Sequence, residues 1–169
     1  MVKAVVVYES LWGNTAAVAG AIAEGLGPEA KVLSTAQATA EELVGVDLVV
    51  AGGPVFGFQL SSEQMRESIR VSPGLGAPAP DLSGPPLRAW LEALPPGTGR
   101  CAAFDTRVRG PFGKGAPTVA EGLEAKGYQL VARPEGFIVS GKYGPLRKGE
   151  LERATRWGRQ LGRSMSSTG

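Results

Sequence analysis

Three short segments of this chain carry polar side chains and glycines that are suited to binding a ligand. They span residues 9–15, 52–58 and 105–115. The first contains Ser10, Asn14 and Thr15, whose hydroxyl and amide groups can donate to an anion, and Gly13, which tolerates a positive φ. If a helix starts here, its first N–H groups also attract negative charge. Residues 10–15 include no lysine or arginine, so the segment predicts an anion site without a basic side chain.

An ordinary strand-to-helix turn with a polar capping residue is the alternative interpretation of this first segment. The segment lacks the Gly-Lys-Ser/Thr of a Walker A loop, and the chain contains no GxGxxG sequence. Neither a P-loop nor a site for the ADP-ribose half of NAD is therefore recognisable.

The composition narrows the chemistry further. The 169 residues include no histidine and a single cysteine, Cys101. The missing histidine excludes a Ser-His-Asp triad, an imidazole base and a histidine metal ligand, and one cysteine forms neither an internal disulfide nor a thiolate zinc site. A single cysteine also suits a reducing compartment, so we expect a cytoplasmic protein. Chemistry must then come from amides, hydroxyls, carboxylates, arginines, aromatic rings or a bound cofactor.

The three segments follow apolar strands in a chain that alternates strands with helices. Strands are expected at residues 5–7, 30–33, 47–51 and 101–104, and a fifth, interrupted near Pro134, at 128–139. Helices are expected at residues 16–26, 39–44, 62–69, 84–94, 117–126 and 148–163. Asn14 or Thr15 would cap the first helix and Ser83 the fourth. This alternation predicts one α/β domain, residues 1–169, with a doubly wound parallel sheet, helices on both faces and a ligand site beyond the carboxyl ends of its strands.

The first segment and the strand before it resemble the flavodoxin signature. The sequence VVVYESLWGNTAAVA matches its apolar strand, aromatic, hydroxyl, small residue and threonine through Val6, Val7, Tyr8, Ser10, Gly13, Thr15 and Ala19. The resemblance implies a flavodoxin-like five-stranded parallel sheet of order 2-1-3-4-5 and bound FMN. It implies that amides and hydroxyls of one loop bind the FMN phosphate. That loop is Ser10, Leu11, Trp12, Gly13, Asn14 and Thr15.

The resemblance assigns the other two segments to the flavin ring. DLVVAGGPVFGFQL implies ring contacts from Pro54, Val55, Phe56, Gly57 and Phe58. Phe56 and Phe58 are the stacking candidates, and the alternative is that one of them packs in the core. AFDTRVRGPFGKG implies contacts from Asp105, Thr106, Arg107, Gly110 and Phe112, with Phe112 the nearest aromatic to the outer stacking position. Arg107 and Arg109 either bring positive charge toward the ring or are solvated.

Three functions fit this reading. The first is a small FMN-binding electron carrier, which needs no catalytic side chain and which we expect. The second is a flavodoxin-like quinone reductase that uses FMN and NAD(P)H. The third is a flavodoxin-like fold that has lost flavin binding, since a fold alone does not establish a function.

The charge of the chain bears on its partners. Residues 1–84 carry 4 basic and 9 acidic side chains, and residues 85–169 carry 14 basic and 7 acidic ones, within a net charge of +2. The basic half is either a solvated face or a nucleic-acid surface, but no nucleic-acid-binding motif accompanies it, so we expect no nucleic-acid partner. Flavodoxins are generally acidic, so a basic chain predicts redox partner proteins with acidic docking surfaces. No apolar stretch approaches the length of a membrane span, so we expect no membrane partner.

Overall fold

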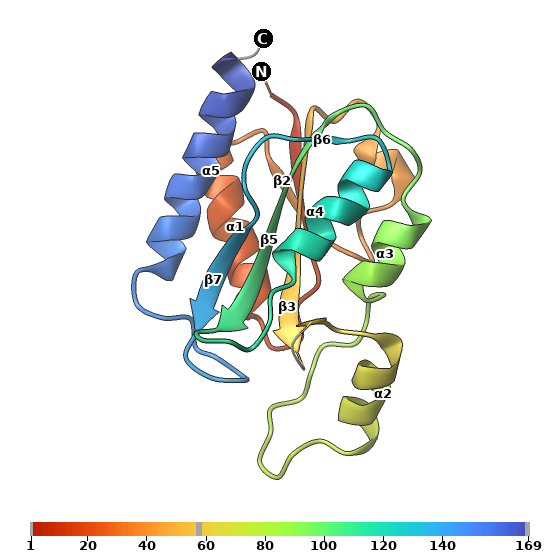
Figure 1. The fold of residues 1–169 in the computed structure, drawn as a ribbon, viewed down its shortest axis with the longest axis vertical. Helices are drawn as coiled ribbons and strands as arrows, with labels where there is room; N and C mark the ends of the chain where they lie inside the picture. The colour runs from red at the N-terminus through yellow and green to blue at the C-terminus, as the bar shows by residue number, and fades with distance from the viewer. Residues whose placement is uncertain (1, 57–58, 168–169) are drawn as a thin grey trace.

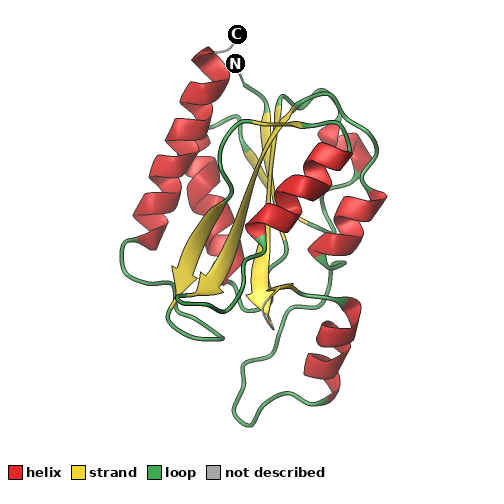
Figure 2. Cartoon of the chain, in the orientation of Figure 1, coloured by secondary structure: helices red, strands yellow, loops and turns green. Residues whose placement is uncertain are grey.

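A parallel sheet covered by helices on both faces forms the centre of the protein, as Figure 1 and Figure 2 show. The computed structural model describes residues 2–56 and 59–167. Its strands are β1 (Ala4–Tyr8), β2 (Lys31–Ser34), β3 (Leu48–Phe56), β4 (Gln59–Leu60), β5 (Arg100–Val108), β6 (Gln129–Leu130) and β7 (Glu135–Val139). Its helices are α1 (Asn14–Leu26), α2 (Glu63–Val71), α3 (Leu87–Ala93), α4 (Ala116–Ala125) and α5 (Glu150–Ser167), with a 3₁₀ helix η1 (Ala40–Leu43).

The strands confirm the expected topology. Their order is β2-β1-β3-β5-β6, with β7 also paired to β5 and the short β4 paired to β3. The β1, β3, β5, β6 and β7 pairings are parallel, whereas β4 runs antiparallel to β3. Together β6 and β7 are the expected fifth strand, whose interruption contains Pro134. They lie at an edge of the sheet, where a missing backbone N–H is tolerated.

Two hydrophobic clusters attach the helices to the two faces of the sheet. One joins α1 and α5 to one face, and its large helical members include Ile22, Trp157 and Leu161. The other joins α3 and α4 to the opposite face, with Leu87 and Trp90 among its members. The central strands β1, β3 and β5 are buried on both faces, which explains why they read as apolar runs in the sequence. Among residues 2–56 and 59–167, no helix combines the length and the apolar character that crossing a bilayer requires.

The helices α1 and α5 approach each other closely because glycines lie at their crossing. A Cβ atom on Gly158 would lie 2.2 Å from the carbonyl oxygen of Ile22, and one on Gly25 would lie 2.0 Å from that of Thr155. No side chain fits at these two positions without moving the backbone of the partner helix.

Two strands are longer than the sequence predicts. The strand β3 continues to Phe56 and β5 continues to Val108, because their pairing extends to the partners Pro54 and Thr106. The prediction that a loop begins at Asp105 is therefore wrong, since Asp105, Thr106 and Arg107 belong to the strand.

The helix starts also differ from some predictions. Gly13, with φ 94°, precedes α1, and neither Asn14 nor Thr15 caps it, because both lie inside the helix. Pro86 precedes α3, whereas the predicted cap Ser83 instead donates its hydroxyl to Asp81 Oδ1 at 2.6 Å. At α2 the side chain of Ser62 accepts a hydrogen bond from the Met65 N–H at 3.2 Å and caps the helix.

Candidate functional site

A cavity of about 440 Å³ lies at the carboxyl ends of the strands, the end that carries the arrowheads in Figure 1. This is the switch point of a doubly wound sheet, where connections leave toward opposite faces. The lining residues are Ser10, Leu11, Trp12, Asn14, Thr15, Pro54, Val55, Phe56, Thr106, Val108, Phe112, Val139 and Lys142. Residues from all three predicted segments therefore meet around one space.

The first loop directs hydrogen-bond donors toward this space at the start of α1. Gly13 adopts a left-handed conformation there, and its N–H donates to Ser10 Oγ at 3.0 Å. The N–H of Ala17 donates to the Gly13 carbonyl at 3.0 Å, so the N–H groups of the three residues before Ala17 have no acceptor within the helix. The Ser10 oxygen is an acceptor in this turn, which leaves its hydroxyl hydrogen free to donate elsewhere.

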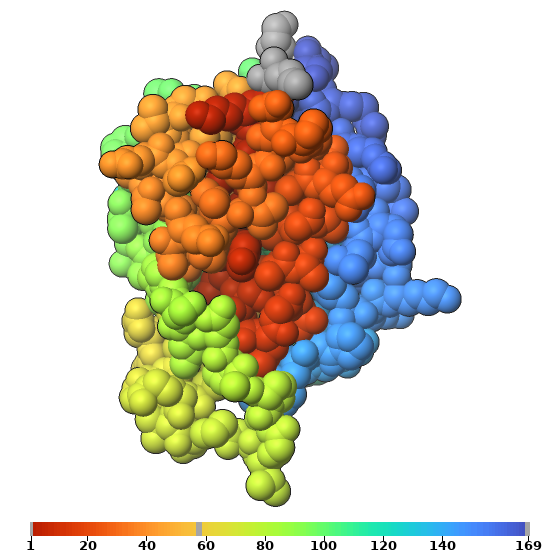
Figure 3. Space-filling model, turned by 180° about the vertical axis from the view of Figure 1, so that it is seen from behind, coloured from red at the N-terminus to blue at the C-terminus, as the bar shows by residue number. Residues whose placement is uncertain are grey.

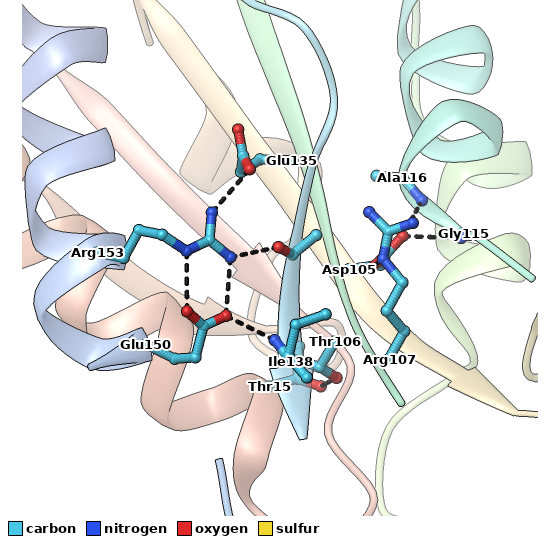
Figure 4. Close-up of polar contacts among 11 residues, drawn as sticks. Thr15, Asp105, Thr106, Arg107, Gly115, Ala116, Glu135, Ile138, Glu150 and Arg153 are labelled. Atoms are coloured by element: carbon cyan, nitrogen blue, oxygen red, sulfur yellow. Dashed lines mark hydrogen bonds and ion pairs between the residues drawn. The ribbon is translucent and has the colours of Figure 1, made fainter. Parts of the chain in front are cut away.

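A pair of buried threonines adds a further donor. Thr15 Oγ1 of α1 and Thr106 Oγ1 of β5 lie 2.8 Å apart, and the two residues are only 1% and 3% exposed (Figure 4). Their shared hydrogen bond uses one of the two hydroxyl hydrogens. The other hydroxyl hydrogen is free to donate to a ligand oxygen in the cavity.

Trp12, Phe56 and Lys142 line the cavity, and Tyr143 packs behind them. The Trp12 ring centroid lies 6.0 Å from that of Phe56 and 4.8 Å from that of Tyr143. The ammonium of Lys142 lies 4.8 Å from the centre of the Phe56 ring and 5.5 Å from that of Tyr143. An apolar ring system and a cation thus stand beside the N–H groups of the first loop.

Phe112 lines the cavity from the loop that follows β5. Gly110, with φ 120°, allows this loop to turn, and a Cβ atom there would lie 2.9 Å from the Phe112 ring. Gly110 therefore shapes the site by letting the ring fold back, although it does not itself line the cavity.

Alternation along β5 keeps two predicted residues out of the cavity. Asp105 is fully buried on the other face of the sheet, where its Oδ2 accepts the N–H groups of Gly115 and Ala116 at 2.9 and 2.8 Å (Figure 4). Arg107 Nε lies 2.9 Å from Asp105 Oδ1, so its charge is paired there and does not line the cavity. Successive side chains of a strand point to opposite faces, so Thr106 reaches the cavity and its two neighbours do not. The placement of Asp105 and Arg107 in the site is corrected accordingly.

Burial sets the electrostatics of Asp105. Removal from water raises the pKa of its carboxyl, while the hydrogen bonds from the two N–H groups and the nearby Arg107 guanidinium oppose that rise. The side chain closes the N-terminus of α4 and so fixes the start of the helix against the sheet.

Three predicted residues remain to be placed. Gly13 shapes the first loop from outside the cavity lining, and Gly57 and Phe58 lie outside the described residues. Of the two stacking candidates, Phe56 and Phe58, the structure describes only Phe56, and Phe56 lines the cavity.

Sequence reasoning missed Val108, Val139 and Lys142. The first two lie at the ends of β5 and β7, and their side chains extend the apolar lining. Lys142 belongs to the connection between β7 and α5, which the Asn14 side chain ties to the first loop by donating from Nδ2 to the Tyr143 carbonyl at 3.1 Å. Asn14 and Tyr143 are 129 residues apart in the sequence, and no local pattern signals their contact.

Ionic contacts anchor the two ends of this connection, as Figure 4 shows. The Arg153 guanidinium of α5 donates to Glu150 at 2.9 and 2.8 Å and to Glu135 Oε1 at 2.7 Å. Glu150 Oε2 also accepts the N–H of Ile138 in β7 at 2.7 Å. The hydrogen bonds from Arg153 hold the pKa of the Glu150 carboxyl below its usual value. The helix and the edge strand are thereby joined next to the cavity.

The segment between α2 and α3 supports the first loop from outside. The N–H of Asp81 donates to the Leu11 carbonyl at 2.8 Å, and Trp12 Nε1 donates to the Pro78 carbonyl at 3.1 Å. Figure 3 shows this yellow-green segment projecting at the lower end of the molecule. Two long-range hydrogen bonds thus restrain the loop that carries the donors.

A buried carboxylate supports the loop from inside. Glu9 is 4% exposed, accepts the Leu87 N–H at 2.9 Å and the Ser61 hydroxyl, and lies 3.9 Å from Arg66 Nε. Burial raises the pKa of Glu9, while the Leu87 N–H, the Ser61 hydroxyl and Arg66 oppose that rise. One residue before Ser10, this carboxylate connects β1 with α2 and α3.

No family model matches this chain, and no curated protein matches its sequence. Its structure does match solved structures. A flavodoxin from the domain Archaea superposes with a TM-score of 0.65 at 18% identity, over 96% of this chain and 98% of that one. Oxidised flavodoxin 2 from Bacillus cereus superposes with a TM-score of 0.65 at 16% identity, over 99% of both chains. The chain has the flavodoxin fold. A flavodiiron core from Synechocystis superposes with a TM-score of 0.61 at 15% identity, over 99% of this chain and 37% of that one.

Proposed function

We propose that the cavity binds FMN and that the protein is a small electron-transfer carrier. The observation that carries this proposal is the meeting of two kinds of surface at the switch point. Hydroxyl and N–H donors lie around Ser10 and Thr15, and apolar side chains including Phe56 and Phe112 line the same space. FMN combines an anionic phosphate with a flat apolar ring, so it needs both surfaces.

The residues present fit this cofactor. The N–H groups at the start of α1, the Ser10 hydroxyl and the Thr15–Thr106 pair would hold the phosphate. Pro54, Val55, Phe56 and Phe112 would hold the ring. A volume of about 440 Å³ falls within the usual range for small-ligand sites. The similarity to solved flavodoxins supports the same choice.

Electron transfer is favoured over side-chain catalysis by what lines the cavity. Among the lining residues, Lys142 alone has an ionisable side chain. FMN supplies the redox chemistry when bound, and the chain's residues bind it, orient it and exclude water from part of its surface.

We propose that redox partners with acidic surfaces dock near the cavity. Exposed basic residues, Arg109, Lys114 and Lys142, lie on the connections around its mouth. They would steer an acidic partner toward the cofactor, with association that weakens as salt increases. A cytoplasmic location stays a prediction. The single cysteine, Cys101, is free and buried, and burial raises the pKa of its thiol to about 12.

The carrier and the quinone reductase differ in what the protein does alone. We expect the FMN-loaded protein to turn over quinone slowly with NAD(P)H and to be reduced rapidly when a flavoprotein reductase is added. Fast unaided reduction of quinone by NAD(P)H would overturn the carrier assignment. Protein that takes up no added FMN would contradict both and leave a flavodoxin fold without flavin.

A further inference from the structure

We propose that Lys142 is a binding residue for the cofactor's phosphate, so that the anion site of this chain includes a cation brought in by a distant loop. This inference rests on the proposed FMN function and deepens it. The sequence of the first loop points to a site without a basic side chain, because residues 10–15 contain none. The folded chain supplies a lysine to the same cavity from the connection between β7 and α5.

Two contacts hold Tyr143, the residue after Lys142, beside the start of α1. Asn14, the first residue of the helix, donates from its side chain to the carbonyl of Tyr143 at 3.1 Å. The Tyr143 ring packs against Trp12 of the first loop, with centroids 4.8 Å apart at an angle of 78°. Lys142 directly precedes Tyr143, so its side chain starts next to the N–H groups that attract an anion.

The surroundings of the ammonium leave it available to a ligand. It lies over the rings of Phe56 and Tyr143, 4.8 and 5.5 Å from their centroids. Lys142 takes no part in the ion pairs found among residues 2–56 and 59–167, and no carboxylate lines the cavity in that part of the chain. A phosphate monoester carries between one and two negative charges at neutral pH, more than a helix N-terminus balances. The charges are therefore complementary, because the ammonium of Lys142 lines the same cavity as Ser10 and Thr15.

The test compares FMN with riboflavin, which has the same ring system and ribityl chain but no phosphate. Binding to flavin-free protein is followed by quenching of flavin fluorescence at low salt. We expect Lys142→Met to weaken FMN binding about fivefold and to leave riboflavin binding unchanged, as for an exposed ion pair. Lys142→Arg should retain most of the FMN affinity. The FMN effect should disappear at about 0.5 M salt, where exposed charges are screened.

Lys148→Met is the matched control, because Lys148 is an exposed lysine of the same connection that does not line the cavity. It changes the net charge equally and should leave FMN affinity within about twofold, since solvated charges contribute little at this distance. Equal loss of FMN and riboflavin affinity in Lys142→Met would overturn the phosphate assignment, as would unchanged FMN affinity. If the unaltered protein binds neither flavin, the proposed function itself fails. That result is distinguishable from the two outcomes for Lys142→Met, because it is seen without any substitution.

Discussion

The hydrogen bond between Thr15 and Thr106 gives the sharpest test of how the site is built. Both residues are buried, at 1% and 3% exposure, and their hydroxyl oxygens lie 2.8 Å apart. Thr15→Val removes one hydroxyl at nearly constant shape and leaves Thr106 without this partner. A buried hydroxyl that loses its partner costs about 1–3 kcal/mol of unfolding free energy. We expect each single valine variant of flavin-free protein to lose about 1–2 kcal/mol.

The double variant, Thr15→Val with Thr106→Val, separates the free energy of the shared hydrogen bond from the contributions of the two hydroxyls. Removing both hydroxyls leaves no unpaired group, so the loss should fall short of the sum of the single losses by about 1 kcal/mol. Urea unfolding at equilibrium, with a common slope for all four proteins, measures the three differences. Losses that add to within about 0.5 kcal/mol would refute the coupling across α1 and β5.

The same variants report on the cofactor. With one donor lost from the proposed phosphate site, Thr15→Val should weaken FMN binding by about 1–3 kcal/mol, measured by fluorescence quenching. An FMN affinity equal to that of the unaltered protein would count against the assignment of Thr15, whatever happens to stability.

Four further variants test how the rest of the fold supports the site. Gly158→Ala should destabilise the protein by about 1–3 kcal/mol in urea unfolding because its Cβ meets the backbone of α1. Gly162→Ala, where a Cβ meets nothing within 4 Å, is the control and should stabilise it by about 0.5–1 kcal/mol. A Gly158→Ala protein as stable as the unaltered one would refute the close crossing. Asp105→Ala should lower the free energy of unfolding by about 2–4 kcal/mol, because two N–H groups and the Arg107 charge lose their partner. A loss below about 0.5 kcal/mol would contradict this role of Asp105. The folded Glu150 carboxyl has a lowered pKa, so its stabilising effect is present above the unfolded pKa of about 4.3 and is lost as pH falls through the folded value. Glu150→Gln should thus be less stable than the unaltered protein at about pH 7 and approach it near pH 3, and a difference independent of pH would exclude the ionic contact.

Most of the fold could be predicted from the sequence because the central strands β1, β3 and β5 are buried on both faces. The run Val5–Val7 reads as a strand without any partner being known, and the alternation of elements then favours a parallel doubly wound sheet. The end of β5 could not be predicted, since residues 105–107 are polar and resemble a loop. Pairing of Thr106 with Pro54 keeps them in the strand, and such pairing is a tertiary property.

Some residues of the candidate site could be predicted from the sequence and others could not. Ser10 and Thr15 were recognisable because a local motif places them at a helix start. Lys142 was not, because a contact between Asn14 and Tyr143 brings it to the cavity from the opposite end of the chain. The prediction placed Arg107 in the site, whereas its guanidinium pairs with Asp105. The register of β5 decides which face of the sheet a side chain occupies, and the sequence does not reveal that register.

Titration of flavin-free protein with FMN tests the central claim most directly. The account predicts saturable quenching of FMN fluorescence at one site per chain, with a Kd below about 1 μM, equivalent to about −8 kcal/mol. It also predicts weaker binding of riboflavin, because the donors at the start of α1 and Lys142 then lack their anion. Absence of quenching at FMN concentrations of about 100 μM would contradict the assignment of the cavity to this cofactor.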